Sequence, residues 1–74
     1  MDIVDIMFHI HPDFSTEQRT RIEETISVDE GVMSVHFSPE HLHEMTVAYD
    51  PVKINSATIL EQLRQWDKET MMAG

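Results

Sequence analysis

The segment IVDIMFHIH, residues 3–11, determines the fold that we predict for this chain. Apolar side chains occupy every second position, at Val4, Ile6, Phe8 and Ile10. Because neighbouring side chains of a strand point to opposite faces of a sheet, this period of two predicts a strand with one buried face. Pro12 has no backbone N–H to donate to a sheet, so it ends the strand.

A helix is predicted to begin near Ser15. Ser15 and Gln18 have the spacing of a capping box, in which each side chain accepts a hydrogen bond from the other residue's backbone N–H. Ile22 and Ile26, four residues apart, give the helix a narrow apolar line. The turn at residues 29–31, Asp-Glu-Gly, ends it.

Two further strands follow this turn. Val32, Val35 and Phe37 begin an extended run that ends at residues 38–40, Ser-Pro-Glu. Residues 45–49 alternate between apolar and small side chains, and the Asp-Pro pair at 50–51 closes that strand. The two strands form a hairpin whose connection, at about residues 38–44, is long and polar.

The second helix is predicted to start at Asn55 or Ser56, both of which are good N-cap residues. Its apolar side chains recur at spacings of four and three: Ile59, Leu63 and Trp66. We expect Trp66 to seal the core. After Asp67 the pattern fades, so residues 68–74 are predicted to be a frayed tail or a short last strand.

The order strand, helix, strand, strand, helix and optional last strand is the split βαβ arrangement. We therefore predict one α+β domain over residues 1–74 with a ferredoxin-like βαββα(β) fold. It has an antiparallel sheet, two helices on one face, and a last strand that is short or absent. This topology brings the end of the first strand and the hairpin connection to the same pole.

The charge of the chain limits the classes of partner that it can bind. Fourteen acidic and five basic residues give a formal net charge of −9. This charge repels phosphate backbones and anionic lipids, so we predict no nucleic-acid partner and expect any protein partner to present a basic surface. No apolar run approaches the roughly 18–20 residues of a membrane span, and the start lacks the basic region of a signal peptide. The predicted location is cytoplasmic, without membrane insertion.

The chain has no cysteine, which excludes thiolate metal sites and a cysteine nucleophile and fits a reducing cytosol. Other catalytic patterns are missing too. Ser15 has no fixed base, Glu23 and Glu24 are predicted to lie on a solvated helix face, and no phosphate-binding loop or zinc-protease motif occurs. We predict that the protein is not an enzyme.

The histidines form the most specific candidate site. His9 and His11 are two residues apart on a strand, so their side chains share one side, with Cα atoms about 6.6–6.8 Å apart. The hairpin connection adds His41 and His43 at the same pole. Neutral imidazole suits Zn²⁺, Ni²⁺ or Cu²⁺, so we predict a divalent metal site. The predicted ligands are His9, His11, His41 and His43.

Other interpretations of these residues remain open. Glu40, Glu44, Asp13 or a second chain could complete the coordination, or the histidines could be exposed residues that bind nothing selectively. Imidazole also titrates near neutral pH, so the same rings could sense protons. The six methionines form no M-x-x-M or M-x-M cluster, and we interpret them as core and tail residues.

Four segments resemble the heavy-metal-associated (HMA) domain family: residues 21–26, 31–35, 46–51 and 59–63. The resemblance implies a ferredoxin-like module that binds copper, zinc or other soft ions and passes them between chaperones and P-type ATPases. It also implies an M-x-C-x-x-C loop between the first strand and the first helix. In this chain Asp13 stands at the methionine position, and Ser15 and Gln18 stand at the cysteine positions. The chain therefore lacks that motif.

Two functions follow as hypotheses. The first is a non-enzymatic, HMA-like metal-handling or chaperone-like domain that uses histidine rather than cysteine for a divalent metal. The alternative is a degenerate HMA-like module for protein interaction or assembly that binds no metal. If the last strand is missing, the first strand becomes a sheet edge, and a homodimer through it would bring two His9–His11 pairs together.

Overall fold

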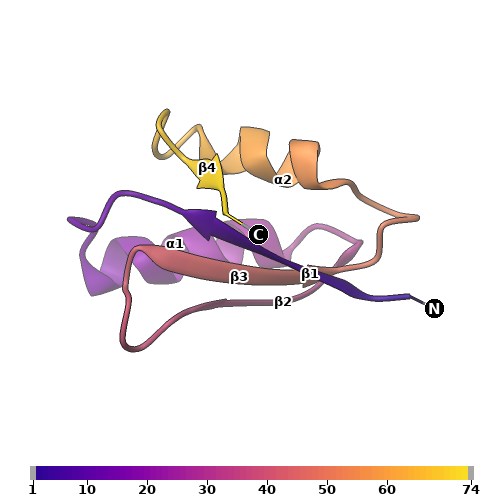
Figure 1. The fold of residues 1–74 in the computed structure, drawn as a ribbon, viewed down its shortest axis with the longest axis horizontal. Helices are drawn as coiled ribbons and strands as arrows, with labels where there is room; N and C mark the ends of the chain where they lie inside the picture. Colours follow the sequence, from indigo (N-terminus) through magenta and orange to yellow (C-terminus); the bar gives the residue numbers. More distant parts are fainter. Residues whose placement is uncertain (1, 74) are drawn as a thin grey trace.

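The computed structural model describes residues 2–73. Its elements in chain order are β1 (Val4–His9), α1 (Thr16–Ser27), β2 (Val32–Phe37), β3 (Glu44–Tyr49), α2 (Ser56–Leu63) and β4 (Met71–Met72). This order confirms the predicted ferredoxin-like α+β fold with a short last strand (Figure 1).

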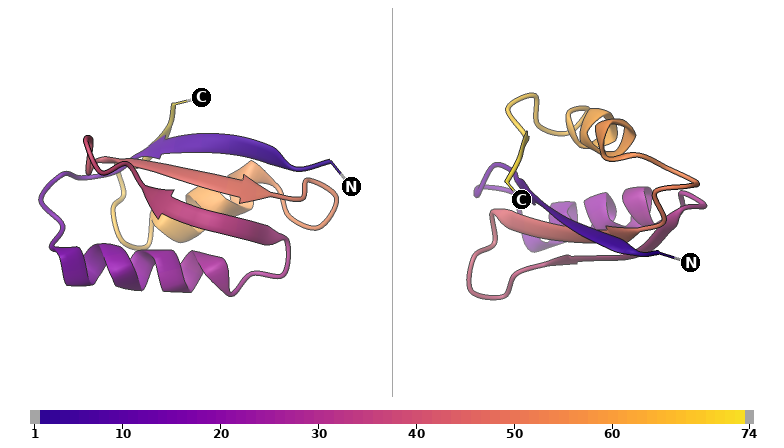
Figure 2. Two further views of the ribbon diagram at one scale, coloured as in Figure 1. Left: turned by 90° about the horizontal axis from the view of Figure 1, so that it is seen from below. Right: turned by 45° about the vertical axis from the view of Figure 1, so that its right-hand side comes forward.

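The sheet has the strand order β2-β3-β1-β4, and every neighbouring pair is antiparallel. Both helices lie on one face of this sheet (Figure 2), and among residues 2–73 no element covers the other face. Because side chains alternate along a strand, this arrangement divides each strand into an inner set that faces the helices and an outer set that faces solvent.

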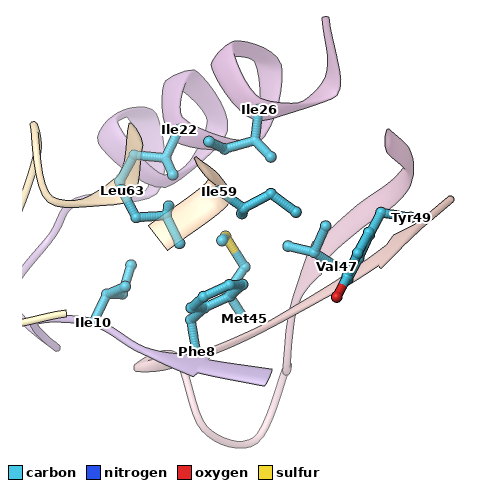
Figure 3. Packing of buried hydrophobic residues seen from close by; sticks show 9 residues of the cluster. All are labelled: Phe8, Ile10, Ile22, Ile26, Met45, Val47, Tyr49, Ile59 and Leu63. Carbon is cyan, nitrogen blue, oxygen red and sulfur yellow. The ribbon is translucent and has the colours of Figure 1, made fainter. Parts of the chain in front are cut away.

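The core lies between the helices and the inner face of the sheet (Figure 3). Each helix contributes two buried residues four positions apart, which are Ile22 and Ile26 from α1 and Ile59 and Leu63 from α2. The strands contribute every second residue, so the predicted periods of four and two are confirmed. The buried strand and strand-end residues are Phe8, Ile10, Met45, Val47 and Tyr49.

Both helices begin where the capping residues predicted. The Oγ of Ser15 accepts a hydrogen bond from the Gln18 backbone N–H at 3.1 Å, and Gln18 Oε1 accepts one from the Ser15 N–H at 2.8 Å. Asn55 caps α2 by accepting from the Thr58 N–H at 2.8 Å. These bonds use backbone donors that a helix start otherwise leaves unpaired.

The expectation that Trp66 seals the core is wrong. The α2 helix ends at Leu63, and the Trp66 N–H donates to the Leu63 carbonyl at 2.9 Å in a tighter turn. This turn moves Trp66 away from the apolar line of the helix and leaves its side chain 37% exposed. Thr70 is fully buried instead, and its hydroxyl donates to the Asp67 carbonyl at 2.8 Å.

The short strand β4 covers only the second half of β1. Met72 lies opposite Phe8, Met71 lies opposite His9, and the Ala73 N–H donates to the Met7 carbonyl at 2.8 Å. Within residues 2–73, the same side of Val4–Ile6 has no strand partner. The homodimer was predicted on the condition that β1 is a sheet edge. Because β4 pairs with Phe8 and His9, only the first half of β1 is such an edge.

Of the two helices within residues 2–73, neither has the length and apolar character that a membrane crossing requires.

Candidate metal site

The histidine-bearing segments meet at one pole of the fold, as the predicted topology required. The Ile10 N–H at the end of β1 donates to the His43 carbonyl in the β2–β3 connection at 2.8 Å. The His11 N–H donates to Asp67 Oδ2, in the connection between α2 and β4, at 2.8 Å. Three connections that are far apart in the sequence therefore lie side by side.

His9 and Glu44 are directly opposite each other on β1 and β3. The bond from Ile10 to His43 lies next to this pair, so the two residues form a non-hydrogen-bonded pair, in which opposing side chains come closest. Both side chains belong to the outer set, away from the helices. The distance between His9 Nε2 and Glu44 Oε2 is 3.6 Å.

The third member of the group, His43, comes from the turn that precedes β3. In this turn the Glu44 N–H donates to the His41 carbonyl at 2.9 Å. His43 Nε2 lies 3.9 Å from Glu44 Oε2, and the ring centroids of His43 and His9 are 5.4 Å apart. One ligand atom from each of His9, His43 and Glu44 lies within 4.8 Å of the other two.

This spacing is close to that of a metal coordination shell. Ligand atoms about 2.0–2.1 Å from a tetrahedral Zn²⁺ are separated by about 3.3–3.4 Å. The observed distances of 3.6 and 3.9 Å exceed that separation by only a few tenths of an ångström. The two imidazole ligand atoms lie within 4.8 Å of each other, so side-chain rotations would have to bring the rings of His9 and His43 together before the three atoms could surround one ion.

The group is accessible and carries a local negative charge. The side chains of His9, His43 and Glu44 are 48%, 42% and 24% exposed. Among residues 2–73, no lysine or arginine lies within ion-pair distance of the Glu44 carboxylate. An ion could reach the group directly from solvent.

The other two predicted ligands lie differently. His41 is exposed, and its ring packs edge-on against His43 at a centroid distance of 5.9 Å. His11 lies beyond the end of β1, where its Nδ1 accepts a hydrogen bond from the Asp13 N–H at 3.1 Å and its ring contacts Phe14. The structure thus brings His41 next to the group, whereas His11 lies in the β1–α1 loop with its ring against Phe14.

Residues 13–18, the end of the β1–α1 loop and the first turn of α1, are joined by helix-capping contacts. Ser15 and Gln18, which the sequence resemblance aligned with the cysteine positions of the HMA motif, bind each other's backbone. The Arg19 guanidinium donates to the Phe14 carbonyl and, at 3.2 Å, to the Thr16 hydroxyl. These contacts tie the polar side chains of this loop to the start of α1.

A surface depression of about 200 Å³ lies beside the group, between the β1–α1 loop and the segment that leads into β4. His9 belongs to both the depression and the three-residue group. The other lining residues are Ile10, His11, Pro12, Asp67, Glu69 and Met71.

Sequence reasoning predicted that His9 and His43 would lie at the same pole, and it named Glu44 only among several residues that could complete the coordination. It missed Met71, which lies opposite His9. The alternation at Glu44–Tyr49 was a signal for the outward direction of Glu44. No pattern in residues 68–74 indicated which residue β4 would place next to His9.

Several solved structures share this fold. A copper binding domain from HMA7, a P-type ATPase, is 14% identical with a TM-score of 0.81, over 95% of this chain and 93% of that chain. The CsoZ metallochaperone is 20% identical with a TM-score of 0.74, over 99% and 100%. Oxidized MerP from Ralstonia metallidurans CH34 is 15% identical with a TM-score of 0.74, over 97% and 96%.

A scan against protein-family models and a search of curated proteins gave no match. The resemblance to HMA domains that the sequence indicated is therefore confirmed at the level of the fold. The chain has the ferredoxin-like fold of HMA domains, a fold that it shares with a copper binding domain, with MerP and with a metallochaperone.

Proposed function

We propose that this protein is a small, non-enzymatic metal-handling domain that binds one divalent transition-metal ion through His9, His43 and Glu44. The observation that carries the proposal is the convergence of two imidazoles and one carboxylate within 4.8 Å at the pole of an HMA-type fold. Such a constellation differs from an exposed acidic cluster because imidazole is the commonest protein ligand for transition metals.

The donor atoms favour Zn²⁺, Ni²⁺ or Cu²⁺. Two nitrogens and one oxygen match the borderline character of these ions, whereas hard ions such as Mg²⁺ and Ca²⁺ prefer oxygen alone. For a given set of nitrogen and oxygen ligands the affinity rises from Ni²⁺ to Cu²⁺ and drops again at Zn²⁺. We therefore expect Cu²⁺ to bind most tightly in vitro.

The remaining predicted ligands are candidates for the fourth position. His41 is the nearer one, since its ring already contacts that of His43. His11 would have to give up its bond from the Asp13 N–H to offer Nδ1. We keep both in the proposed set and expect His41 to contribute more than His11.

The partial exposure of His9, His43 and Glu44 suits a domain that transfers its bound ion to a partner protein. A ligand from a partner can reach the ion because the group lies on an open rim, and the similar solved structures include a metallochaperone. Because the chain has a formal net charge of −9, we propose that its protein partner presents a basic surface. We also propose that the protein is located in the cytoplasm.

The test is a titration with Zn²⁺, Ni²⁺ and Cu²⁺ followed by the NMR signals of the five histidine rings. We expect saturable changes with a dissociation constant below about 10 µM, centred on His9 and His43. His9→Ala and His43→Ala should each remove this binding. His36→Ala is the matched control, because His36 is an exposed histidine on β2, opposite Thr46 and outside the group.

Weak millimolar changes spread over all five rings in the unmodified protein would contradict the proposal. That outcome would favour the alternative function, a protein-interaction or assembly module without metal. Titration of His11→Ala and His41→Ala in the same way decides which of the two belongs to the ligand set.

A further inference from the structure

Strand β1 lies between β3 and β4 in the sheet (Figure 1). Met71 of β4 is therefore the neighbour of His9 on the side of β1 that faces away from Glu44. Directly opposite residues of antiparallel strands point to the same face, and their Cβ atoms lie about 4.5–5.5 Å apart. His9 therefore lies in a row with Glu44 on one side and Met71 on the other. All three side chains belong to the outer face of the sheet.

The thioether of Met71 is freely accessible. Its side chain is 64% exposed and lines the same surface depression as His9 and His11. Met45, by contrast, is fully buried on the inner face of β3. An exposed methionine beside an imidazole contributes little to the core, so its sulfur is available to a ligand in the depression.

The residues on either side of β4 fix the position of Met71. Thr70 is fully buried and its hydroxyl bonds to the Asp67 carbonyl, and the Ala73 N–H bonds to the Met7 carbonyl. The Arg64 guanidinium also donates to the Thr70 carbonyl at 3.2 Å. These anchors hold Met71 in register with His9 although the strand has only two residues.

We propose that Met71 is a specificity-determining ligand, which supplies a thioether to the site at His9 and His43 when the bound ion is soft. The inference rests on the proposed function, because it uses the same two imidazoles. Thioether sulfur suits Cu(I), whereas carboxylate oxygen is a ligand of Zn²⁺ and suits harder ions. His9 thus lies between a hard and a soft ligand, and the ion selects which of the two completes the shell.

Two substitutions should therefore have opposite effects. Met71→Leu keeps the approximate volume and removes the sulfur, so we expect it to lower Cu(I) affinity about tenfold or more and to leave Zn²⁺ affinity unchanged within about twofold. Glu44→Gln should instead lower Zn²⁺ affinity and leave Cu(I) affinity unchanged within about twofold. Cu(I) affinity is measured without oxygen against bicinchoninate, and Zn²⁺ affinity is measured against a chromophoric chelator.

Met72→Leu is the matched control, because Met72 is the next residue of β4, lies opposite Phe8 and belongs to the inner face. It should change neither affinity. Circular dichroism and thermal melts establish that each variant is folded.

X-ray absorption of the Cu(I)-loaded, unmodified protein gives a second measurement that needs no variant. Because the chain has no cysteine, any sulfur bound to copper must come from a methionine. We expect a copper–sulfur contribution that disappears in Met71→Leu and persists in Met72→Leu.

The outcomes separate this inference from the proposed function. Zn²⁺ binding at His9 and His43 together with a Cu(I) shell free of sulfur would overturn the role of Met71 and leave the proposed function standing. A copper–sulfur signal that survives Met71→Leu would also overturn it. Failure of the unmodified protein to bind any of these ions would overturn both.

Discussion

Two regions at the same pole of the fold differ in what their polar side chains do. Where the β1–α1 loop enters α1, Ser15 and Gln18 bind each other's backbone at 3.1 and 2.8 Å, and Arg19 binds the Phe14 carbonyl and the Thr16 hydroxyl. At the rim formed by β1 and the β2–β3 connection, the His9 and His43 Nε2 atoms lie 3.6 and 3.9 Å from one oxygen of Glu44, Oε2.

The difference separates side chains that already hydrogen-bond to the backbone from side chains that do not. A side chain that caps a helix stabilises the protein by about 0.5–2 kcal/mol, and it must give up that contribution before it can bind an ion. The rim residues give up no bond of this kind. The loop therefore serves the stability of α1, whereas the rim is free for a ligand.

The strongest test of this contrast is the double variant His9→Ala/His43→Ala. With Zn²⁺ at 100 times its dissociation constant, the unmodified protein should gain about 2.7 kcal/mol of stability, seen as a higher Tm. The double variant should gain none, because both imidazole ligands are gone. A Zn²⁺-dependent rise in the Tm of the double variant equal to that of the unmodified protein would break the contrast.

A substitution at the opposite pole separates stability from binding. A Cβ atom on Gly31 would lie 2.6 Å from Ile54 Cγ2 and 2.9 Å from Lys53 Cβ, so the turn after α1 must shift to accept it. We expect Gly31→Ala to lower the free energy of unfolding by about 1–3 kcal/mol. Urea unfolding measures this loss, and the Zn²⁺ affinity of the folded protein should not change.

Ser15→Ala tests the loop side of the comparison. Loss of the cap should lower the free energy of unfolding by about 1 kcal/mol, because the Gln18 N–H loses its acceptor. Zn²⁺ affinity should stay within about twofold of the original value. A large loss of affinity would instead place the metal site in the β1–α1 loop.

The smallest expected effect comes from Glu17→Gln, which removes one negative charge in the first turn of α1, outside the group His9, His43 and Glu44. Glu17 pairs with Arg21 at 3.3 Å, but both side chains are mostly exposed, so the change in stability should be below about 0.5 kcal/mol. It is the charge-matched control for Glu44→Gln. If isothermal titration calorimetry showed equal losses of Zn²⁺ affinity in the two variants, overall charge rather than coordination by Glu44 would explain the binding.

Most of the fold could be predicted because its signals are local. The alternation at residues 3–11 and 45–49, the caps Ser15 and Asn55, and the Ile pair of α1 each lie within a few neighbouring residues. The position of Trp66 could not be predicted from the sequence. Trp66 keeps the helical spacing of three from Leu63, but α2 ends at Leu63 and the chain then forms a tighter turn.

The site could be predicted only in part. Topology brings the end of β1 to the hairpin connection, so His9 and His43 were expected to meet. His11 was expected beside His9, but the chain leaves the ladder before Pro12, and the His11 ring turns to Asp13 and Phe14. The expectation that His11 is a ligand stays a prediction that the titration of His11→Ala tests.

The sequence by itself determined the order of strands and helices, the two helix starts, the inner and outer faces of the strands, and the lack of any thiolate. Only the tertiary structure decided that Glu44 and Met71 lie on either side of His9. The physical reason is that period and capping arise from interactions within a few residues, whereas strand register depends on the lengths of connecting loops and on packing of the core. The two-residue strand β4, which Thr70 and Ala73 hold in place, is too short to show a period in the sequence. Its pairing with β1 is therefore known only from the folded chain.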